Sequence, residues 1–271
     1  MIANGLHGDS VPYRNEAVYG IGMSINKEEL AHLIRDKYHG DAEADVSGDI
    51  ERLTAGEPLA YVIGWIPFLG LDIFLDSHPL IPRPETEWWA ELLVEHLKVR
   101  FADNPFTLLD VCAGSGAVGL AVLKNCPNAT VSFGELSPAH AALIEKNIKV
   151  NALDASRAIV RSGDLFAPFL HETFDILAAN PPYIPADRAL EPSVTDYEPH
   201  DALYSGNDGL DLIRRLATHA PHHLPDGGEL WMECDSEHAD DAALILRDGG
   251  AVRTAVRTDL YGRPRLVLAY Y

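Results

Sequence analysis

The sequence predicts an α/β protein with a mainly parallel sheet and helices on both of its faces. Three observations lead to this fold class. From Thr107 onward, apolar strand-like segments alternate with helical patterns, as in chains built from βαβ units. The first of these strands runs into a glycine-rich turn that opens a helix. The 271 residues are 47% hydrophobic, which is enough for a large core.

Short helices are expected near the N-terminus, after a frayed lead-in over 1–23. An apolar stripe predicts a helix over 25–38, with Ser24 as its N-cap. A second helix over 47–55 would end at Gly56, because glycine is favourable just beyond a helix C-terminus. These helices predict a small helical N-terminal domain over 1–60.

Two β-like runs follow, over 61–65 and 71–75. The segment 67–70 joins them and contains both proline and glycine. Alternating apolar residues on either side of such a segment are typical of a hairpin. We therefore expect a β-hairpin linker over 61–80.

A longer helix is predicted from Pro84 to about Phe101. Proline suits the first turn of a helix, and the acidic residues Glu85 and Glu87 suit its N-terminus. The domain over 81–271 begins here. Its strands are expected at 108–112, 129–133, 158–161, 174–178, 229–233, 251–256 and 265–269, and its further helices at 116–125, 137–150, 208–219 and 236–247.

The chain is acidic, with 41 Asp and Glu residues against 21 Lys and Arg residues and a formal net charge of −20. Binding to nucleic acid through phosphate neutralisation needs a basic patch, so direct nucleic-acid binding is not expected. The same charge disfavours anionic membrane surfaces. We assign the acidity to the surface, where it promotes solubility.

The three cysteines also restrict the class of protein. Cys112, Cys126 and Cys234 are widely spaced and form no CxxC pair, so neither a disulfide framework nor a structural metal site is expected. The N-terminus lacks a signal-peptide pattern, and no apolar run is long enough to cross a membrane. These features predict a cytoplasmic protein without a membrane partner.

The segment from Asp110 to Gly119 joins the first strand of the sheet to its first helix. Glycines let the backbone approach a ligand, and ligands of open α/β sheets bind at the carboxyl ends of strands. The next strand ends near Glu135, where an acidic residue would hold ribose hydroxyls. Gly114, Gly116 and Gly119 also match GxGxxG, so a nicotinamide-dependent oxidoreductase is an alternative.

The tetrad Asn180-Pro181-Pro182-Tyr183 follows the apolar strand over 174–178. Consecutive prolines fix the backbone and remove two N–H donors, which leaves carbonyl groups free to accept hydrogen bonds. The Asn180 side-chain oxygen and the Pro181 carbonyl would together accept both hydrogens of a planar –NH2 group. Tyr183 would pack against the plane of that group.

Such a pair of acceptors suits methyl transfer to an amide or aromatic amine nitrogen. The lone pair of that nitrogen is delocalised, which makes it a poor nucleophile. Two acceptors on its hydrogens favour the electron-rich nitrogen of the transition state, and no strong base is required. Placement in line with a sulfonium methyl group supplies the remaining catalysis. A rigid loop without chemistry is the alternative interpretation.

On these motifs the chain resembles the HemK/PrmC family, the protein-(glutamine-N5) methyltransferases that modify peptide chain release factors. The tetrad is shared with amino-methyltransferases that act on DNA, RNA and protein, whereas the motifs at 81–87 and 197–210 are more specific. The resemblance extends from about Glu51 to the C-terminus. It is carried by 56–64, 68–71, 80–87, 110–116, 180–183, 197–199, 202–203 and 206–210.

The resemblance implies a Rossmann-like methyltransferase domain that uses S-adenosylmethionine, preceded by a helical domain and a β-hairpin linker. Glu135 would bind the ribose of the cofactor, and Asp164 and Leu165 would lie by its adenine. The turn that faces the methionine part would follow Asp110 and consist of Cys112, Ala113, Gly114, Ser115 and Gly116.

The resemblance also implies a site for the substrate glutamine. Asn180, Pro181 and Tyr183 would be the catalytic residues, with Pro182 completing the binding site and Asn180 also touching the cofactor. Arg83 would line the substrate pocket. The partner implied is a release factor, methylated on the glutamine of its Gly-Gly-Gln motif.

Three departures from the family pattern stand out. The family commonly has glycine where this chain has Cys112, and usually aspartate where it has Glu135. Cysteine is small, and glutamate accepts two ribose hydrogen bonds with a longer reach. The N-terminal piece is shorter than the usual helical domain, which helps to recognise the release factor.

The sequence is also compatible with other functions. The same reaction on a glutamine of another protein, or on an exocyclic amine of a nucleic acid, would use the same tetrad. The oxidoreductase alternative leaves that tetrad unexplained, and a non-catalytic binding module would not need it. Glu233-Cys234-Asp235 is interpreted as a capped strand-to-helix turn rather than as a ligand cluster.

Overall fold

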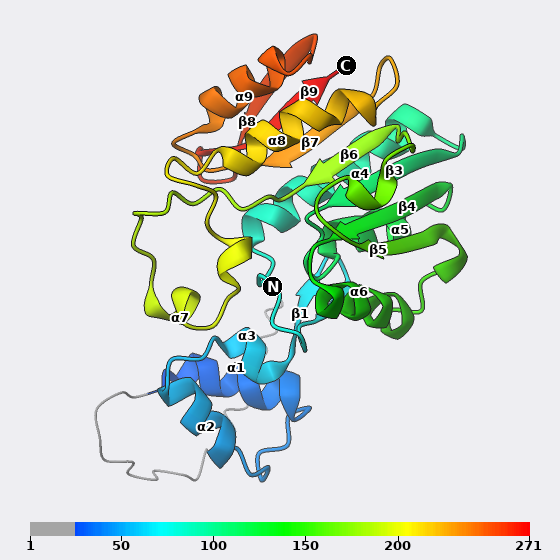
Figure 1. Cartoon of the computed structure of the whole chain (residues 1–271). Coiled ribbons are helices and arrows are strands. Elements are labelled where there is room, and N and C mark those ends of the chain that lie inside the picture. Colours follow the sequence, from blue (N-terminus) through cyan, green and yellow to red (C-terminus); the bar gives the residue numbers. More distant parts are fainter. Residues whose placement is uncertain (1–24) are drawn as a thin grey trace, which may run out of the picture.

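The structure is a computed structural model of the protein, and residues 25–271 of it are described (Figure 1). The predicted lead-in over 1–23 and the predicted N-cap Ser24 lie outside these residues. The chain forms a group of N-terminal helices, a two-stranded hairpin and a seven-stranded sheet flanked by helices.

The N-terminal helices are α1 (Lys27–Lys37), α2 (Ser47–Thr54) and α3 (Leu59–Ile63). Helix α1 begins with a capping box, in which Asn26 Oδ1 accepts from the Glu28 N–H at 2.8 Å. The N-cap is therefore Asn26, two positions beyond the Ser24 that the sequence predicted. The helices at 25–38 and 47–55 are otherwise confirmed.

The strand predicted over 61–65 is wrong, because Tyr61, Val62 and Ile63 belong to α3. A short apolar run cannot be assigned to strand or helix from its periodicity alone. Pro58 precedes the helix, and Gly64 ends it in the left-handed conformation, with φ of 94°.

A hairpin does follow, made of β1 (Trp65–Phe68) and β2 (Leu71–Phe74). The two strands pair antiparallel across a tight turn at Leu69 and Gly70. The predicted hairpin is thus confirmed, with its first strand shifted toward the C-terminus.

The main sheet has the strand order β5-β4-β3-β6-β7-β9-β8. Strand β9 pairs antiparallel with both of its neighbours, while β3 to β7 form parallel pairs, so the predicted mainly parallel sheet is confirmed. The strands are β3 (Phe106–Val111), β4 (Ala129–Glu135), β5 (Ala158–Ser162), β6 (Ile176–Ala179), β7 (Glu229–Glu233), β8 (Arg253–Thr258) and β9 (Pro264–Tyr270).

Helices cover both faces of this sheet. The side chain of Leu108 on β3 packs in the same core cluster as Leu93 of α4, whereas its neighbour Leu109 packs with Ile213 of α8 on the other face. The helices of this domain are α4 (Pro84–Phe101), α5 (Ala117–Asn125), α6 (Pro138–Val150), α7 (Pro192–Thr195), α8 (Asp211–His219) and α9 (Ala239–Asp248).

Asn147 of α6 and Asn151, the C-cap residue of that helix, hold the hairpin against α6. Asn151 Oδ1 accepts from the Asp72 N–H at 2.9 Å, and its Nδ2 donates to the Asp72 carbonyl at 2.8 Å. The buried Asn147 bonds both backbone groups of Phe74 in the same way and also donates to the Ser115 carbonyl at 3.0 Å. One side chain therefore contacts both the hairpin and the glycine-rich turn.

The loop that carries α7 lies beside the blue N-terminal helices in Figure 1. The Tyr197 hydroxyl donates to the Ala55 carbonyl at 2.9 Å, which joins this loop to the segment after α2. Across residues 25–271, none of the helices combines the length and the apolar character needed to span a bilayer.

Candidate active site

A cavity of about 690 Å³ opens at the carboxyl ends of β3, β4 and β6. Its volume lies in the range of pockets that bind small molecules. Ten residues predicted for the site line it together: Asp110, Cys112, Ala113, Gly114, Ser115, Glu135, Asp164, Leu165, Asn180 and Pro182.

The other predicted residues lie around this cavity. Pro181, Tyr183 and Arg83 line a smaller cavity of about 170 Å³, and Asn180 borders both cavities. Gly116 lines neither of these two cavities; it is the N-cap residue of α5 and has φ of 82°. The tetrad thus stands between two compartments.

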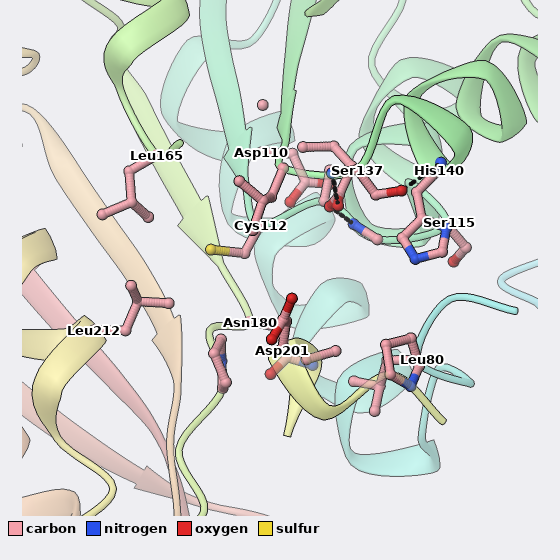
Figure 2. Close-up of a pocket in the computed structure, with 18 of the residues that line it drawn as sticks. Leu80, Asp110, Cys112, Ser115, Ser137, His140, Leu165, Asn180, Asp201 and Leu212 are labelled. Carbon is pink, nitrogen blue, oxygen red and sulfur yellow. Dashed lines mark hydrogen bonds between the residues drawn. The ribbon is translucent and has the colours of Figure 1, made fainter. Parts of the chain in front are cut away.

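Cys112 occupies the first position of the glycine-rich turn and has φ of 60°. This left-handed backbone costs a residue with a side chain about 1–2 kcal/mol, which explains why glycine suits the position. The Cys112 sulfur points into the cavity in Figure 2. Burial, with Glu135 and Asp110 nearby, raises the pKa of the Cys112 thiol, so it stays protonated at neutral pH.

Gly119 is required for packing. A Cβ atom on Gly119 would lie 2.3 Å from a ring carbon of Phe133 and 3.0 Å from Asp110 Oδ2. The last glycine of the GxGxxG pattern therefore lets α5 approach the sheet, and this need exists whatever ligand the turn binds.

Asp110 is a buried carboxyl at the end of β3, and its Oδ2 accepts from the Gly119 N–H at 2.8 Å. Burial raises the pKa of Asp110 to about 8; the charge of Glu135 adds to the rise, and the Gly119 N–H opposes it. The native protein therefore holds a proton on Asp110 at neutral pH, whereas the unfolded chain, with a pKa of about 3.9, does not.

This difference predicts a pH-dependent stability. Because the native pKa of Asp110 is raised, its contribution to the free energy of unfolding is complete below about pH 4 and is lost as the pH rises toward 8. Asp110→Asn keeps an acceptor for the Gly119 N–H, and the side-chain amide of asparagine does not titrate. In thermal melts, the melting temperature of Asp110→Asn minus that of the unsubstituted protein should be larger at pH 9 than at pH 5 by at least about 3 °C.

Asp76→Asn is the matched control, because Asp76 is an exposed aspartate that pairs with Lys146. Its melting temperature should differ from that of the unsubstituted protein by the same amount at both pH values. If the melting temperature of Asp110→Asn also differed from that of the unsubstituted protein by the same amount at pH 5 and pH 9, Asp110 would not be neutral in the native state.

Glu135 connects the glycine-rich turn to the start of α6. Its Oε2 accepts from the Gly114 N–H at 2.8 Å, and its Oε1 accepts from the Ser137 N–H at 2.9 Å. Each carboxylate oxygen has a second acceptor position, so two hydroxyl groups of a ligand can still bind. The length of glutamate allows it to reach Gly114 while it lines the cavity.

The opposite wall of the cavity is apolar and ends in an ion pair. Leu165 and Leu212 lie on the same side of the cavity in Figure 2. Asp164 accepts from Arg215 at 2.7 Å, and both side chains are about half exposed. An apolar wall with a carboxylate at its edge suits a flat heterocycle that carries an amino group.

Asn180 directly follows β6 and faces the cavity. Its Nδ2 donates to Thr86 Oγ1 at 3.3 Å, and within residues 25–271 no group donates to Asn180 Oδ1, which is therefore a free acceptor there. The Tyr183 hydroxyl donates to Glu233 Oε1 at 3.0 Å. Burial, followed by the charge of Glu233, raises the pKa of Tyr183 well above its usual value, so this phenol is not a base at neutral pH.

Two residues near the tetrad, Thr86 and Glu233, were missed by the sequence reasoning. Thr86 Oγ1 donates to Glu233 Oε2 at 2.7 Å, and the Trp89 indole N–H donates to the same oxygen at 2.7 Å. The predicted turn after Glu233 is present, since Asp235 accepts from the Glu237 N–H at 2.8 Å. No spacing in the sequence links Thr86 to Glu233, although Thr86 belongs to the motif at 81–87.

Arg83 is held by the loop that carries α7. Its guanidinium pairs with the buried Glu198, which also accepts from the Ile81 N–H at 3.1 Å. Arg83 therefore reaches the wall of the smaller cavity with one side of its guanidinium already bonded. In the described part of the chain, no group of three or more His, Cys, Asp or Glu side chains is arranged to hold a metal ion.

Known proteins resemble this chain in sequence and in fold. The family model of the methyltransferase small domain matches residues 87–196. A release factor glutamine methyltransferase of Deinococcus radiodurans is 39% identical over 250 residues, covering 91% of this chain and 86% of the relative. A release factor glutamine methyltransferase of Flavobacterium psychrophilum is 31% identical over 278 residues, covering 94% and 96%.

A solved structure of a methyltransferase from Pyrococcus furiosus shares the fold. Its TM-score is 0.54 at 17% identity, and the match covers 83% of this chain and 98% of that chain. The predicted Rossmann-like methyltransferase fold is confirmed.

Proposed function

We propose an activity for this chain, which belongs to the family of release factor glutamine methyltransferases: it transfers a methyl group from S-adenosylmethionine to a glutamine side-chain amide. The acceptor is the N5 nitrogen of the glutamine in the Gly-Gly-Gln motif of a peptide chain release factor. The observation that carries the proposal is the free oxygen of Asn180 at the border of two cavities.

The larger cavity fits S-adenosylmethionine in size and charge. Its volume is about 690 Å³, and its lining includes the carboxyl side chains of Glu135, Asp164 and Asp201. These groups suit a ligand with a sulfonium and an ammonium group. When bound, the cofactor supplies an electrophilic methyl group on its sulfonium. Glu135 would hold the ribose, Asp164 and Leu165 the adenine, and the turn over 112–116 the methionine part.

The tetrad would hold the substrate amide from the smaller cavity. Asn180 Oδ1 and the Pro181 carbonyl accept its two hydrogens, which favours the electron-rich nitrogen of the transition state. Tyr183 packs against the amide, and Arg83 lines the pocket. The methylated amide is a strong acid until it loses its extra proton, so water can take that proton. This agrees with the protonated states of Tyr183 and Cys112, neither of which is a base.

The domain boundaries follow the same proposal. The proposed units are the helical domain, whose last helix α3 ends at Ile63, the hairpin linker up to residue 80 and the methyltransferase domain over 81–271. The helical domain contributes to release-factor recognition, in line with the bond that joins Tyr197 to Ala55 beside the substrate side of the site.

Labelled S-adenosylmethionine and purified release factors test the activity. Mass spectrometry should find one added methyl group on the glutamine of the Gly-Gly-Gln motif, and Asn180→Ala should leave that glutamine unmodified in the same time. Label on another protein or on nucleic acid, with every release factor unmodified, would replace the proposed substrate.

A further inference from the structure

Glu233 is a buried carboxyl that no step of the proposed reaction uses. It is the last residue of β7, is 1% exposed and lies behind the tetrad. Its Oε2 accepts from Thr86 and from Trp89, both at 2.7 Å, and its Oε1 accepts from the Tyr183 hydroxyl at 3.0 Å. Burying a carboxyl group is costly unless its partners stabilise it, and each partner of Glu233 is either part of the tetrad or lies next to it.

The hydrogen bonds of this group have a fixed direction. The indole of Trp89 can only donate, so Glu233 Oε2 acts as an acceptor. The Thr86 hydroxyl gives its single hydrogen to the same oxygen. The Thr86 oxygen can then only accept, and its donor is Asn180 Nδ2 at 3.3 Å.

This direction decides which end of the Asn180 amide faces the substrate. The oxygen and the –NH2 group of an asparagine have nearly the same shape, so packing alone does not choose between them. With Nδ2 bonded to Thr86, Oδ1 is left for a ligand. The reversed amide would present hydrogens to the hydrogens of a glutamine amide, and it would also place two acceptors, Asn180 Oδ1 and Thr86 Oγ1, against each other.

We propose that Glu233 and Thr86 are positioning residues for the tetrad. The Glu233 carboxylate aligns the Thr86 hydroxyl, and Thr86 holds the Asn180 amide with its oxygen toward the substrate. The same carboxylate holds the Tyr183 ring through its hydroxyl group. This assignment rests on the proposed function, because it gives Asn180 Oδ1 and Tyr183 their roles toward the glutamine amide.

The surroundings of Glu233 support an acceptor role. Burial raises its pKa, while the donors Thr86, Trp89 and Tyr183 and the positive charge of Arg265 oppose the rise. Because Thr86 and Trp89 both donate to Oε2, that oxygen is an acceptor whether or not the other oxygen carries a proton. An apolar residue would fill the same space without selecting an orientation of Asn180.

Thr86→Val removes the hydroxyl and keeps the shape, and Thr86→Ser keeps the hydroxyl. We expect Thr86→Val to lower kcat for release-factor methylation by about tenfold or more, as is typical of coupled residues in one hydrogen-bond network. Thr86→Ser should restore most of that loss. The Kd of S-adenosylmethionine, measured by calorimetry, should change by less than about threefold in both variants. A purely structural role predicts equal kcat values for Thr86→Val and Thr86→Ser.

A double-mutant cycle tests whether Thr86 acts through Asn180. In the Asn180→Ala background, Thr86→Val should cause no further loss of kcat, because the amide it orients is gone. If Thr86→Val lowered kcat in the Asn180→Ala background by the same factor as in the unsubstituted protein, the assignment would be overturned.

Glu233→Gln keeps an acceptor oxygen for Thr86 and Trp89, whereas Glu233→Leu removes it. Where the two variants have equal melting temperatures, Glu233→Gln should retain more methylation activity than Glu233→Leu; equal activities would also overturn the assignment.

One readout does not depend on the substrate. The ¹⁵N NMR signal of the Asn180 side-chain amide can be assigned by its absence in Asn180→Ala. The chemical shift of this signal should change more in Thr86→Val than in Thr86→Ser, and the amide hydrogens should exchange faster with solvent in Thr86→Val. An unchanged signal would overturn the positioning role. If the unsubstituted protein methylates no release factor, the proposed function fails, while this signal still tests the orientation of Asn180.

Discussion

Asn180→Ala is expected to lower kcat for glutamine methylation by about 10²- to 10³-fold, the loss typical of removing one preorganised hydrogen-bonding group that acts in the transition state. Asn180 Oδ1 is a free acceptor at the border of the two cavities, and alanine offers no acceptor there. The Pro181 carbonyl remains and can hold only one of the two hydrogens. Single-turnover assays with saturating S-adenosylmethionine measure this loss directly.

The affinity for the cofactor separates a catalytic effect from a binding defect. We expect the Kd of S-adenosylmethionine for Asn180→Ala to stay within about threefold, because Glu135 and the glycine-rich turn are unaltered. Asn104→Ala is a matched control, since the exposed Asn104 side chain donates to the Phe101 carbonyl at 3.0 Å and is absent from the lining of the cavity. Normal turnover by Asn180→Ala would refute the role of the tetrad.

Glu135→Ala is expected to raise the Kd of S-adenosylmethionine by about 10²-fold or more. Two hydrogen bonds from ribose hydroxyls to a carboxylate are worth about 1.5–3 kcal/mol each. Alanine also leaves the N–H groups of Gly114 and Ser137 without their acceptor, so the turn and the start of α6 lose their shared anchor. Titration calorimetry with the purified protein gives the Kd.

Glu135→Asp is the matched control. Aspartate keeps the charge and is usual in the family that the sequence resembles, so we expect its Kd to stay within about tenfold of that of the unsubstituted protein. Unaltered affinity in Glu135→Ala would rule out the ribose role. Heat of binding from NAD and none from S-adenosylmethionine would instead favour the oxidoreductase alternative.

Most of the sheet could be predicted because most of its strands are contiguous apolar segments; β8, with two arginines and two threonines, is an exception. Strand β7 and helix α4 occupy the residues predicted for them. The reversal of β9 could not be predicted, because it depends on pairing with β7 and β8 rather than on its own residues. Helix α3 was mistaken for a strand because a short β-branched run fits both structures.

The residues of the candidate site also fall into those that could be predicted from the sequence and those that could not. The turn over 110–116 and the tetrad could be recognised because each is contiguous in sequence; they meet at the cavity because β3 and β6, which they follow, are parallel neighbours in the sheet. The contact of Thr86 with Glu233 spans 147 positions in the chain, and that of Arg83 with Glu198 spans 115. Only the fold brings such pairs together.

The contacts of Asn147 and Asn151 also have a consequence for the edge of β2 that does not pair with β1. A free strand edge offers a row of N–H and carbonyl groups to any unpaired chain, and such edges promote aggregation. On β2, the amides of Asn147 and Asn151 bond the N–H and carbonyl groups of Phe74 and Asp72, as a neighbouring strand would. Two side chains thus replace an additional strand and close this edge against association with other chains.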